Sequence, residues 1–171
     1  MSKVKNTNKK EKNMGGDIKI RKLNKKDLPL VYRLIQNTID FSYSGVYPPE
    51  AIEFFKDYHN KENIIKDAAA GYTIVAERDG EILGTGTLLD TNIRRVYISP
   101  SYQHRGIGKL IVQELERKAL LKKLSTLDLE GNIVSRQFWE AMGFTIREEC
   151  FLMVKNNRKL HYYVMVKKNG M

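Results

Sequence analysis

Two glycines between a strand and a helix constrain this chain more than any other feature of its sequence. Residues 96–98 are apolar and β-prone, and Ser99-Pro100 ends that strand because proline has no N–H to give to a neighbouring strand. Gly106 and Gly108 follow, and the apolar residues after them recur at helical spacing. Glycines at a helix start let a ligand approach free N–H groups at the positive end of the helix dipole. The pattern predicts an anion site, most naturally for a pyrophosphate.

Two common phosphate-binding loops do not fit these glycines. A Walker loop has Ser or Thr after its lysine, whereas Leu110 follows Lys109 here. A dinucleotide-binding loop needs a third glycine, and Ile111 stands at that position. A tight turn without a ligand is the alternative interpretation of a lone Gly-x-Gly.

A different pattern does fit. Residues 103–108 read Gln-x-x-Gly-x-Gly after a strand that ends at Ile98, and residues 132–144 read NIVSRQFWEAMGF. These two motifs resemble those of the GNAT superfamily of acyl-CoA-dependent N-acyltransferases, Gln/Arg-x-x-Gly-x-Gly/Ala and Asn-x-x-Ala-x-x-Phe-Tyr-x-x-x-Gly-Phe. The resemblance covers about residues 17–167. It implies acetyl-CoA as the cosubstrate and an amine as the acceptor.

Composition suits a single domain in a reducing compartment. The 171 residues suffice for one sizeable core, and no apolar run is long enough to span a bilayer. The first residues lack the apolar segment of a signal peptide. Cys150 is the only cysteine, which excludes an internal disulfide and favours a cytoplasmic location. We interpret Cys150 as a buried strand residue rather than a catalytic thiol.

The net charge of +10 divides between a tail and a body. Residues 1–16 hold five lysines and one glutamate, so that they contribute +4 and the body +6. We expect residues 1–16 to be a disordered basic tail and residues 17–171 to be the N-acetyltransferase domain. Positive charge suits a cofactor with several phosphates. The lysines are scattered rather than interleaved with aromatic residues, so nucleic acid is not an expected partner.

Periodicity and turn signals predict an α/β fold with a mixed, mostly antiparallel central sheet and helices on both faces. Strands are expected at residues 17–22, 72–77, 82–89, 92–98, 124–129, 144–154 and 161–167. Helices are expected at residues 24–39, 49–58, 61–70, 109–122 and 133–142. An ordinary crossover makes the fifth strand parallel to the fourth. In the GNAT fold these two strands splay apart and hold the pantetheine arm between them.

The resemblance implies a cofactor site around the loop and the fourth strand. Loop amides would hold the pyrophosphate, the backbone of Ile98 would bond the pantetheine, and a strand amide would polarise the acetyl carbonyl. Asn132 matches the family asparagine that bonds the pantetheine arm, with a helix N-cap as the alternative. His104 lies at the wrong end of the cofactor to be a base. The implied cofactor-binding residues are Tyr97, Ile98, Gln103, His104, Arg105, Gly106, Ile107, Gly108, Lys109, Asn132 and Trp139.

The residue that takes the proton from the amine is less defined. Some relatives use a glutamate on the fourth strand, but here Arg94 and Arg95 occupy its middle. Glu130, at the end of the fifth strand and close to the splay, is the first candidate, and Glu77 is the second. The alternatives are that both are surface carboxylates and that a water chain carries the proton.

Three tyrosines and one tryptophan complete the expected site. Tyr43 and Tyr47, after the first helix, and Tyr163, on the last strand, are candidates for binding the acceptor, with packing as the alternative. Trp139 departs from the family, which usually has a tyrosine there to protonate the departing CoA sulfur. Because the indole N–H does not ionise usefully, we expect the sulfur to leave as thiolate or to take its proton from water or a nearby tyrosine.

The expected function is transfer of an acetyl group from acetyl-CoA directly to a primary amine of a small molecule or peptide. Two alternatives stay open: a transferase for a longer acyl group, and a non-catalytic acyl-CoA-binding module whose basic tail contacts nucleic acid. The acyl donor that the protein uses distinguishes the first alternative from an acetyltransferase, and the absence of turnover distinguishes the second. We expect no metal and no membrane partner, and a homodimer is left open.

Overall fold

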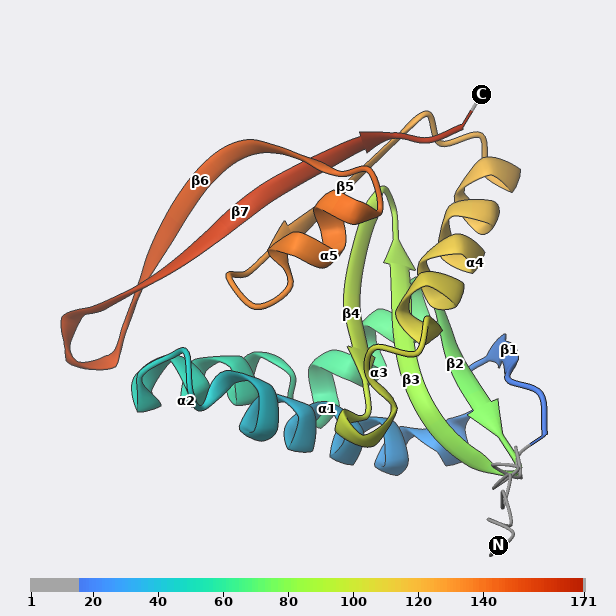
Figure 1. Ribbon diagram of the computed structural model, residues 1–171, viewed down its shortest axis with the longest axis horizontal. Helices are drawn as coiled ribbons and strands as arrows, with labels where there is room; N and C mark the ends of the chain where they lie inside the picture. The colour runs from blue at the N-terminus through green and yellow to red at the C-terminus, as the bar shows by residue number, and fades with distance from the viewer. Residues whose placement is uncertain (1–15, 171) are drawn as a thin grey trace, which may run out of the picture.

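The computed structural model describes residues 16–170 of the chain and shows one sheet covered by helices on both faces (Figure 1). The predicted basic tail lies outside the described residues except for Gly16. The strands are β1 Lys19–Lys22, β2 Tyr72–Arg78, β3 Glu81–Leu89, β4 Asn92–Ile98, β5 Thr126–Gly131, β6 Thr145–Val154 and β7 Arg158–Lys168. The α-helices are α1 Leu28–Tyr43, α2 Pro49–Tyr58, α3 Lys61–Ala70, α4 Ile107–Leu121 and α5 Arg136–Ala141.

The sheet has seven strands in the order β1-β2-β3-β4-β5-β7-β6. Every neighbouring pair is antiparallel except β4 and β5, which are parallel and share the single register pair Asn92 and Asp128. The predicted mixed sheet with helices on both faces and parallel fourth and fifth strands is therefore confirmed. Because β4 and β5 pair only at one end, the sheet opens into a V at the other (Figure 1).

Each face of the sheet has its own core. The face under α4 packs against Ile111, Val112 and Leu115, the apolar residues at helical spacing after the glycines, and all three are fully buried. The opposite face packs against α1 through Val31 and Ile35, with α2 and α3 alongside. Burying each of these side chains stabilises the fold by about 1.5–3 kcal/mol. The two cores hold the helices, and hence the loop before α4, at fixed positions on the sheet.

Two element boundaries differ from the predicted ones in ways that matter for the site. Helix α1 continues to Tyr43, so this residue lies on a helix rather than in a loop. Strand β7 begins at Arg158 rather than at residue 161, because the turn before it is tight. Asn156 and Asn157 form that turn with φ of 58° and 55°, values that asparagine tolerates better than most residues.

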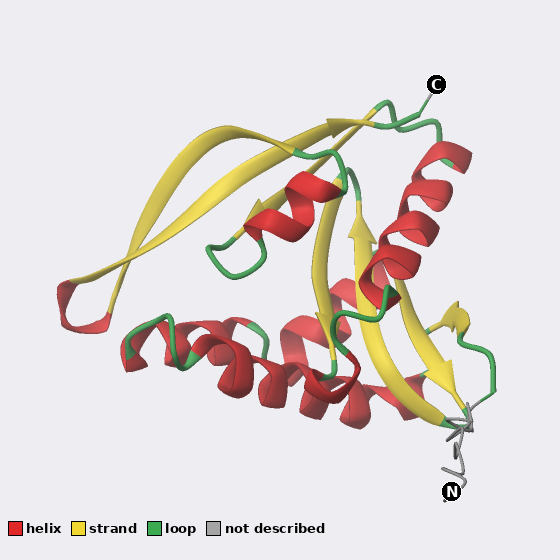
Figure 2. Ribbon diagram, in the orientation of Figure 1, coloured by secondary structure: helices red, strands yellow, loops and turns green. Residues whose placement is uncertain are grey.

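The β6–β7 hairpin extends beyond the rest of the sheet, and its tip lies beside α2 (Figure 2). Lys155 at the tip forms an ion pair with Glu53, and the Asn156 amide donates to the Glu50 carboxylate over 3.0 Å. The hairpin and α2 thus face each other across the open side of the V. Within residues 16–170, no helix combines the length and the apolar character that crossing a bilayer requires.

Candidate active site

The glycine loop leads from β4 into the first turn of α4. His104 and Gly106 have φ of 60° and 81°, and Gly106 immediately precedes the helix. A Cβ at Gly106 would meet open space, so its requirement for glycine is the positive φ itself. Ile107 is buried and anchors the helix start, whereas Arg105 and Lys109 are exposed. The unpaired N–H groups of the first turn therefore lie at an exposed, positively charged helix end.

The second glycine serves packing between helices. A Cβ at Gly108 would lie 3.1 and 3.2 Å from two ring carbons of Phe138, on α5. These distances are tighter than ordinary contacts, so a side chain here would displace the ring. Gly108 thus lets α5 approach the start of α4.

Gln103 braces the loop. Its side-chain amide donates to the Ile98 carbonyl over 3.1 Å and to the Ser42 hydroxyl over 3.3 Å. The Thr38 hydroxyl also donates to the Ile98 carbonyl over 3.4 Å. The end of β4, the loop and α1 are therefore tied together, and the Gln103 side chain is already committed to these contacts.

A cavity of about 380 Å³ lies in the V between β4 and β5. Helix α2 and the β6–β7 hairpin form its outer walls. Its apolar and aromatic wall includes Phe54, Phe55, Tyr58, Leu152 and Leu160. Its polar lining comes from β4, from the end of β5 and from the loop before α5. The cavity is large enough for a small organic molecule.

A β-bulge shapes the β4 wall of this cavity. Thr85 lies opposite Tyr97 and Thr87 opposite Arg94, so β4 contains one residue more than β3 over this span. Arg95 accommodates the bulge with φ of 52°, a value that is uncommon for a residue with a side chain of this size. The bulge interrupts the regular hydrogen-bond ladder at the V, and the backbone there is held in a strained, fixed conformation.

A chain of hydrogen bonds crosses the cavity. The Asn132 amide donates to the Tyr43 hydroxyl over 2.9 Å, and that hydroxyl donates to the Tyr97 hydroxyl over 3.4 Å. Tyr97 in turn shares a 3.0 Å hydrogen bond with His59 Nε2. The Asn132 oxygen meanwhile accepts from the Ser135 N–H over 3.0 Å, so this side chain also orders the turn before α5. The chain links β5, α1, β4 and the end of α2.

Burial keeps the titratable side chains of this hydrogen-bonded chain neutral. It raises the pKa of Tyr43, and it raises that of Tyr97 further. It also lowers the pKa of His59 to about 3, an effect that the nearby Arg95 charge reinforces and that Asp67 opposes. At neutral pH the hydrogen-bonded chain therefore contains two neutral phenols and a neutral imidazole.

The buried imidazole makes stability depend on pH. The pKa of His59 is lower in the folded than in the unfolded state, so below about pH 6.5 the unfolded state binds a proton that the folded state does not. The free energy of unfolding is therefore highest above this pH and decreases as pH falls. Between pH 6.5 and 5 the free energy of unfolding should fall by about 2 kcal/mol from this group. Urea unfolding at both pH values should show this loss in the natural protein and in His161→Gln, but not in His59→Gln. An equal loss in His59→Gln would contradict it.

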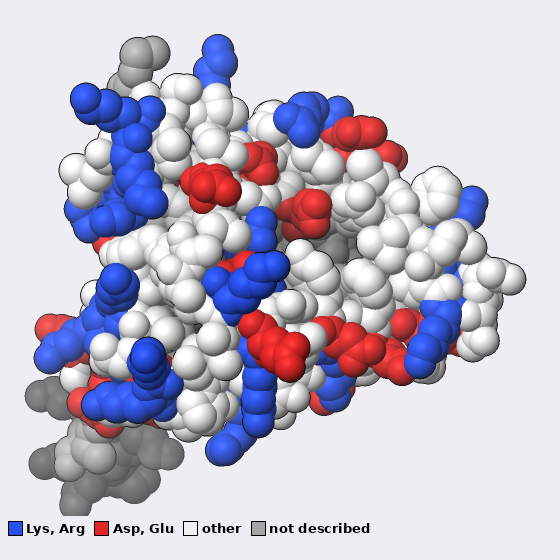
Figure 3. Space-filling view, turned by 180° about the vertical axis from the view of Figure 1, so that it is seen from behind, with Lys and Arg blue, Asp and Glu red and all other residues white. Residues whose placement is uncertain are grey.

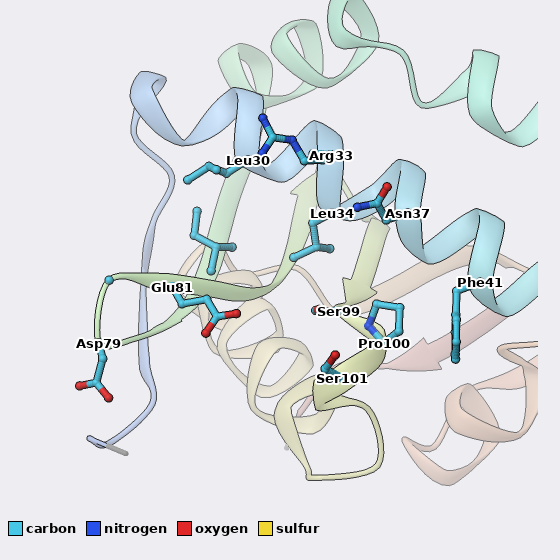
Figure 4. Close-up of a pocket in the computed structure, with 12 residues that line it drawn as sticks. Leu30, Arg33, Leu34, Asn37, Phe41, Asp79, Glu81, Ser99, Pro100 and Ser101 are labelled. Atoms are coloured by element: carbon cyan, nitrogen blue, oxygen red, sulfur yellow. The ribbon is translucent and has the colours of Figure 1, made fainter. Parts of the chain in front are cut away.

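A second, wider hollow lies elsewhere, between α1, the β2–β3 turn and residues 99–101 (Figure 4). It measures about 690 Å³ and is more open to solvent. Leu30 and Phe41 from α1 and Glu81 from β3 border it. It lies away from the V and from the hydrogen-bonded chain, so we place the candidate active site in the smaller cavity.

Comparison with known proteins shows the family of this chain. Residues 33–144 match the model of the acetyltransferase (GNAT) family, and this span is more than half of the chain. The chain belongs to the GNAT family. Its glycine loop and the strands β4 and β5 that form the V lie within the matched region.

Relatives of this GNAT chain cover 77–90% of its length. A spermidine N(1)-acetyltransferase of Thermoplasma acidophilum is 24% identical over 152 residues, which are 77% of this chain and 90% of that protein. A GCN5-related N-acetyltransferase from Rhodopseudomonas palustris superposes with a TM-score of 0.81 at 17% identity, over 90% of this chain and 97% of that one. The PaiA N-acetyltransferase from Thermoplasma acidophilum, solved with coenzyme A, gives 0.72 at 23%, over 90% and 99%. At such identities the solved structures share the fold.

The structure brings several of the expected site residues to one place. Tyr43, Tyr97, Glu130, Asn132 and Trp139 all line the cavity of the V. Glu130 is exposed, at the end of β5 that leads into the V. These five residues come from five separate elements or loops, which only the fold brings together.

Three residues that were expected to act in catalysis or acceptor binding lie outside the cavity. Glu77 forms an ion pair with Arg21 of β1, two strands away from the V. The Tyr47 hydroxyl accepts from the Ile133 N–H over 3.0 Å, and Tyr163 packs against the core under α4. Their positions favour packing and ion-pair roles.

Sequence reasoning missed His59 and Tyr162, which both line the cavity. Tyr162 precedes the expected Tyr163 and therefore faces the opposite side of β7. His59 follows the last residue of α2, and no local pattern separates it from an ordinary surface histidine. Its signal is the contact with Tyr97, which only the fold provides.

Proposed function

We propose that this GNAT domain is an N-acetyltransferase that transfers an acetyl group from acetyl-CoA directly to a primary amine. The observation that carries the proposal is the juxtaposition of an exposed, glycine-lined helix start with a cavity in the V between β4 and β5. The first suits a pyrophosphate, and the second suits a thioester meeting a nucleophile. A relative that acts on spermidine and a neighbour solved with coenzyme A are consistent with it.

In this proposal the backbone does most of the cofactor binding. Amides of residues 104–109 hold the pyrophosphate, and the Gly106 conformation keeps space free for it. The pantetheine arm lies along β4 from Ile98 and contacts Asn132. An amide at the β4 bulge donates to the acetyl oxygen, which becomes more negative when the amine attacks. The bulge is fixed before substrate arrives, so this donor requires little reorganisation.

The reaction forms a C–N bond, breaks the C–S bond and moves one proton from the amine. Glu130 is the lining carboxylate at the V, and we keep it as the first candidate to accept the proton. Glu77 is a weaker candidate, because it is ion-paired with Arg21 and lies two strands from the V. The departing sulfur leaves as thiolate or takes a proton from water or from the Tyr43 and Tyr97 hydroxyls that line the same cavity.

Trp139 is expected to pack rather than to transfer a proton. Its ring is 6% exposed and lies 4.9 Å from Phe138 and 5.4 Å from Phe144, centroid to centroid. Loss of a general acid costs about 10²–10⁴ in rate, so Trp139→Phe should lower kcat by far less than a hundredfold. It should instead raise the KM for acetyl-CoA and lower Tm, as steady-state kinetics and thermal unfolding would show. A hundredfold fall in kcat with KM and Tm unchanged would contradict a packing role.

The proposal is tested by thiol release from acetyl-CoA with a panel of amines, with each product identified by mass spectrometry. Longer acyl-CoA donors in the same assay decide the acyl group. CoA binding by calorimetry without transfer to any amine would favour the binding module over the enzyme. A nucleic-acid role for the body of that module has little support, since basic side chains on one face are separated by acidic ones and by uncharged surface (Figure 3).

A further inference from the structure

Two arginines on one wall of the cavity bear on the charge of the acetyl acceptor. Arg94 and Arg95 are consecutive on β4, and consecutive strand residues normally face opposite sides of a sheet. The bulge at Arg95 changes this, and both guanidiniums reach the same carboxylate, that of Asp67 on α3. Both arginines also line the cavity. The bulge thus places two positive charges together on the β4 wall of the cavity.

The positive charge on this wall exceeds the negative charge. One buried carboxylate, Asp67, neutralises one of the two guanidiniums. His59, beside them, is neutral, and the lining carboxylate Glu130 lies on the other side of the V, on β5. The side chain of Arg94 is 30% exposed, so that a ligand in the cavity can reach it.

The same wall has unused hydrogen-bonding capacity. Across residues 16–170, the buried side-chain polar atoms without a partner are Arg95 Nε and His59 Nδ1. Both belong to residues that line this cavity, and both side chains pack against the Tyr58 ring. A buried N–H without a partner is costly, and a small shift of either side chain that brings this N–H to a hydrogen-bond acceptor of a ligand would reduce that cost.

We propose that the acetyl acceptor is an amine that also carries a carboxylate, an amino acid with an apolar side chain, and that Arg94 and Arg95 bind the carboxylate. This inference rests on the proposed N-acetyltransferase function. The amine lies towards Tyr97 and Asn132, and the apolar side chain lies against Phe54 and the other aromatic residues of α2. A cavity of about 380 Å³ suits a molecule of this size. A polyamine would instead bring additional positive charges next to two guanidiniums.

The experiment compares amino acids with their decarboxylated amines, which differ only in the group that the arginines would bind. Phenylalanine with phenethylamine, leucine with 3-methylbutylamine, and spermidine are offered with acetyl-CoA, and CoA release and product mass are measured. A charge-assisted bond should raise kcat/KM for at least one amino acid over its amine about tenfold to a hundredfold. Equal or better use of the amines or of spermidine overturns the proposal and leaves the N-acetyltransferase function standing. No transfer to any of these compounds or to any amine of the broader panel, with CoA bound, overturns both.

A variant identifies the binding group. Arg94→Gln is chosen over a change at Arg95 because the Arg94 side chain is the more exposed of the two and its loss is less disruptive. It should raise the KM for the amino acid about tenfold or more and leave kcat/KM for the matched amine unchanged. Arg117→Gln, on the exposed side of α4, is the matched control and should change neither. Equal effects of Arg94→Gln on the amino acid and the amine would overturn the role of this arginine.

Discussion

Replacing Gly106 with aspartate is expected to abolish CoA binding while the domain stays folded. Gly106 precedes α4 with φ of 81°, and a side chain there would project into open space rather than into protein. In the proposed function that space belongs to the pyrophosphate. At an effective dielectric constant near ~20, two like charges about 4 Å apart repel by about 4 kcal/mol, or about a thousandfold in affinity. Calorimetry with CoA measures the loss.

Asparagine at the same position is the matched control. Asparagine and aspartate have nearly the same shape and both tolerate positive φ, so the backbone cost is shared and only the charge differs. Gly106→Asn should therefore bind CoA more weakly than the natural protein, because its side chain fills the same space, but clearly more tightly than Gly106→Asp, with similar Tm values for the two variants. Gly108→Asp is a less clean test, because its Cβ would already press on Phe138 at 3.1 Å. Natural affinity in a folded Gly106→Asp variant would show that the pyrophosphate binds elsewhere.

Most elements of the fold could be predicted because their signals are local. Helix α2 begins at Pro49 and α3 ends before Gly71, as proline at a helix start and glycine after a helix end predict. The glycine loop was identified for the same reason, since strand, proline, glycines and helix are contiguous. The end of α1 was placed too early because serine and tyrosine before Gly45 look like a loop, whereas packing of Tyr43 against Phe55 and Tyr97 keeps the helix intact.

The cavity could be predicted only in part because its walls depend on contacts between distant segments. His59 meets Tyr97 across 38 residues, and Asn132 meets Tyr43 across 89. The position of Arg95 depends on a bulge, and a bulge reverses the alternation from which strand faces are inferred. Glu77 looked suitable at a strand end, but strand order places it two strands from the V. The sequence motifs predicted the residues expected to bind the cofactor, whereas most residues of the cavity could be identified only from the fold.

Asp67 is expected to be the most important single ion-pairing residue for stability. Its side chain is 12% exposed and accepts from Arg94 over 3.1 Å and from Arg95, whose own side chain is 4% exposed. Burial by itself would raise the pKa of Asp67, but bonds from Arg95 and Arg94 hold the pKa below its ordinary value. Asp67→Asn keeps the shape of the side chain and leaves a buried guanidinium without its counter-charge. Breaking a buried pair in this way costs about 3–5 kcal/mol.

Thermal unfolding measures this cost directly. For a chain of this size, 1 kcal/mol corresponds to about 2–4 °C, so Asp67→Asn should lower Tm by about 10 °C. Asp40→Asn is the matched control, since Asp40 pairs with Lys56 at the surface and such a pair contributes about 1 kcal/mol or less. Because a depressed carboxyl pKa stabilises only while the group is ionised, the difference between natural protein and Asp67→Asn should disappear as pH falls below the pKa of Asp67. Equal Tm losses in the two variants would mean that solvent or another group already compensates the charge of Arg95. The β4 bulge would then keep its shape without the ion pairs from Asp67 of α3.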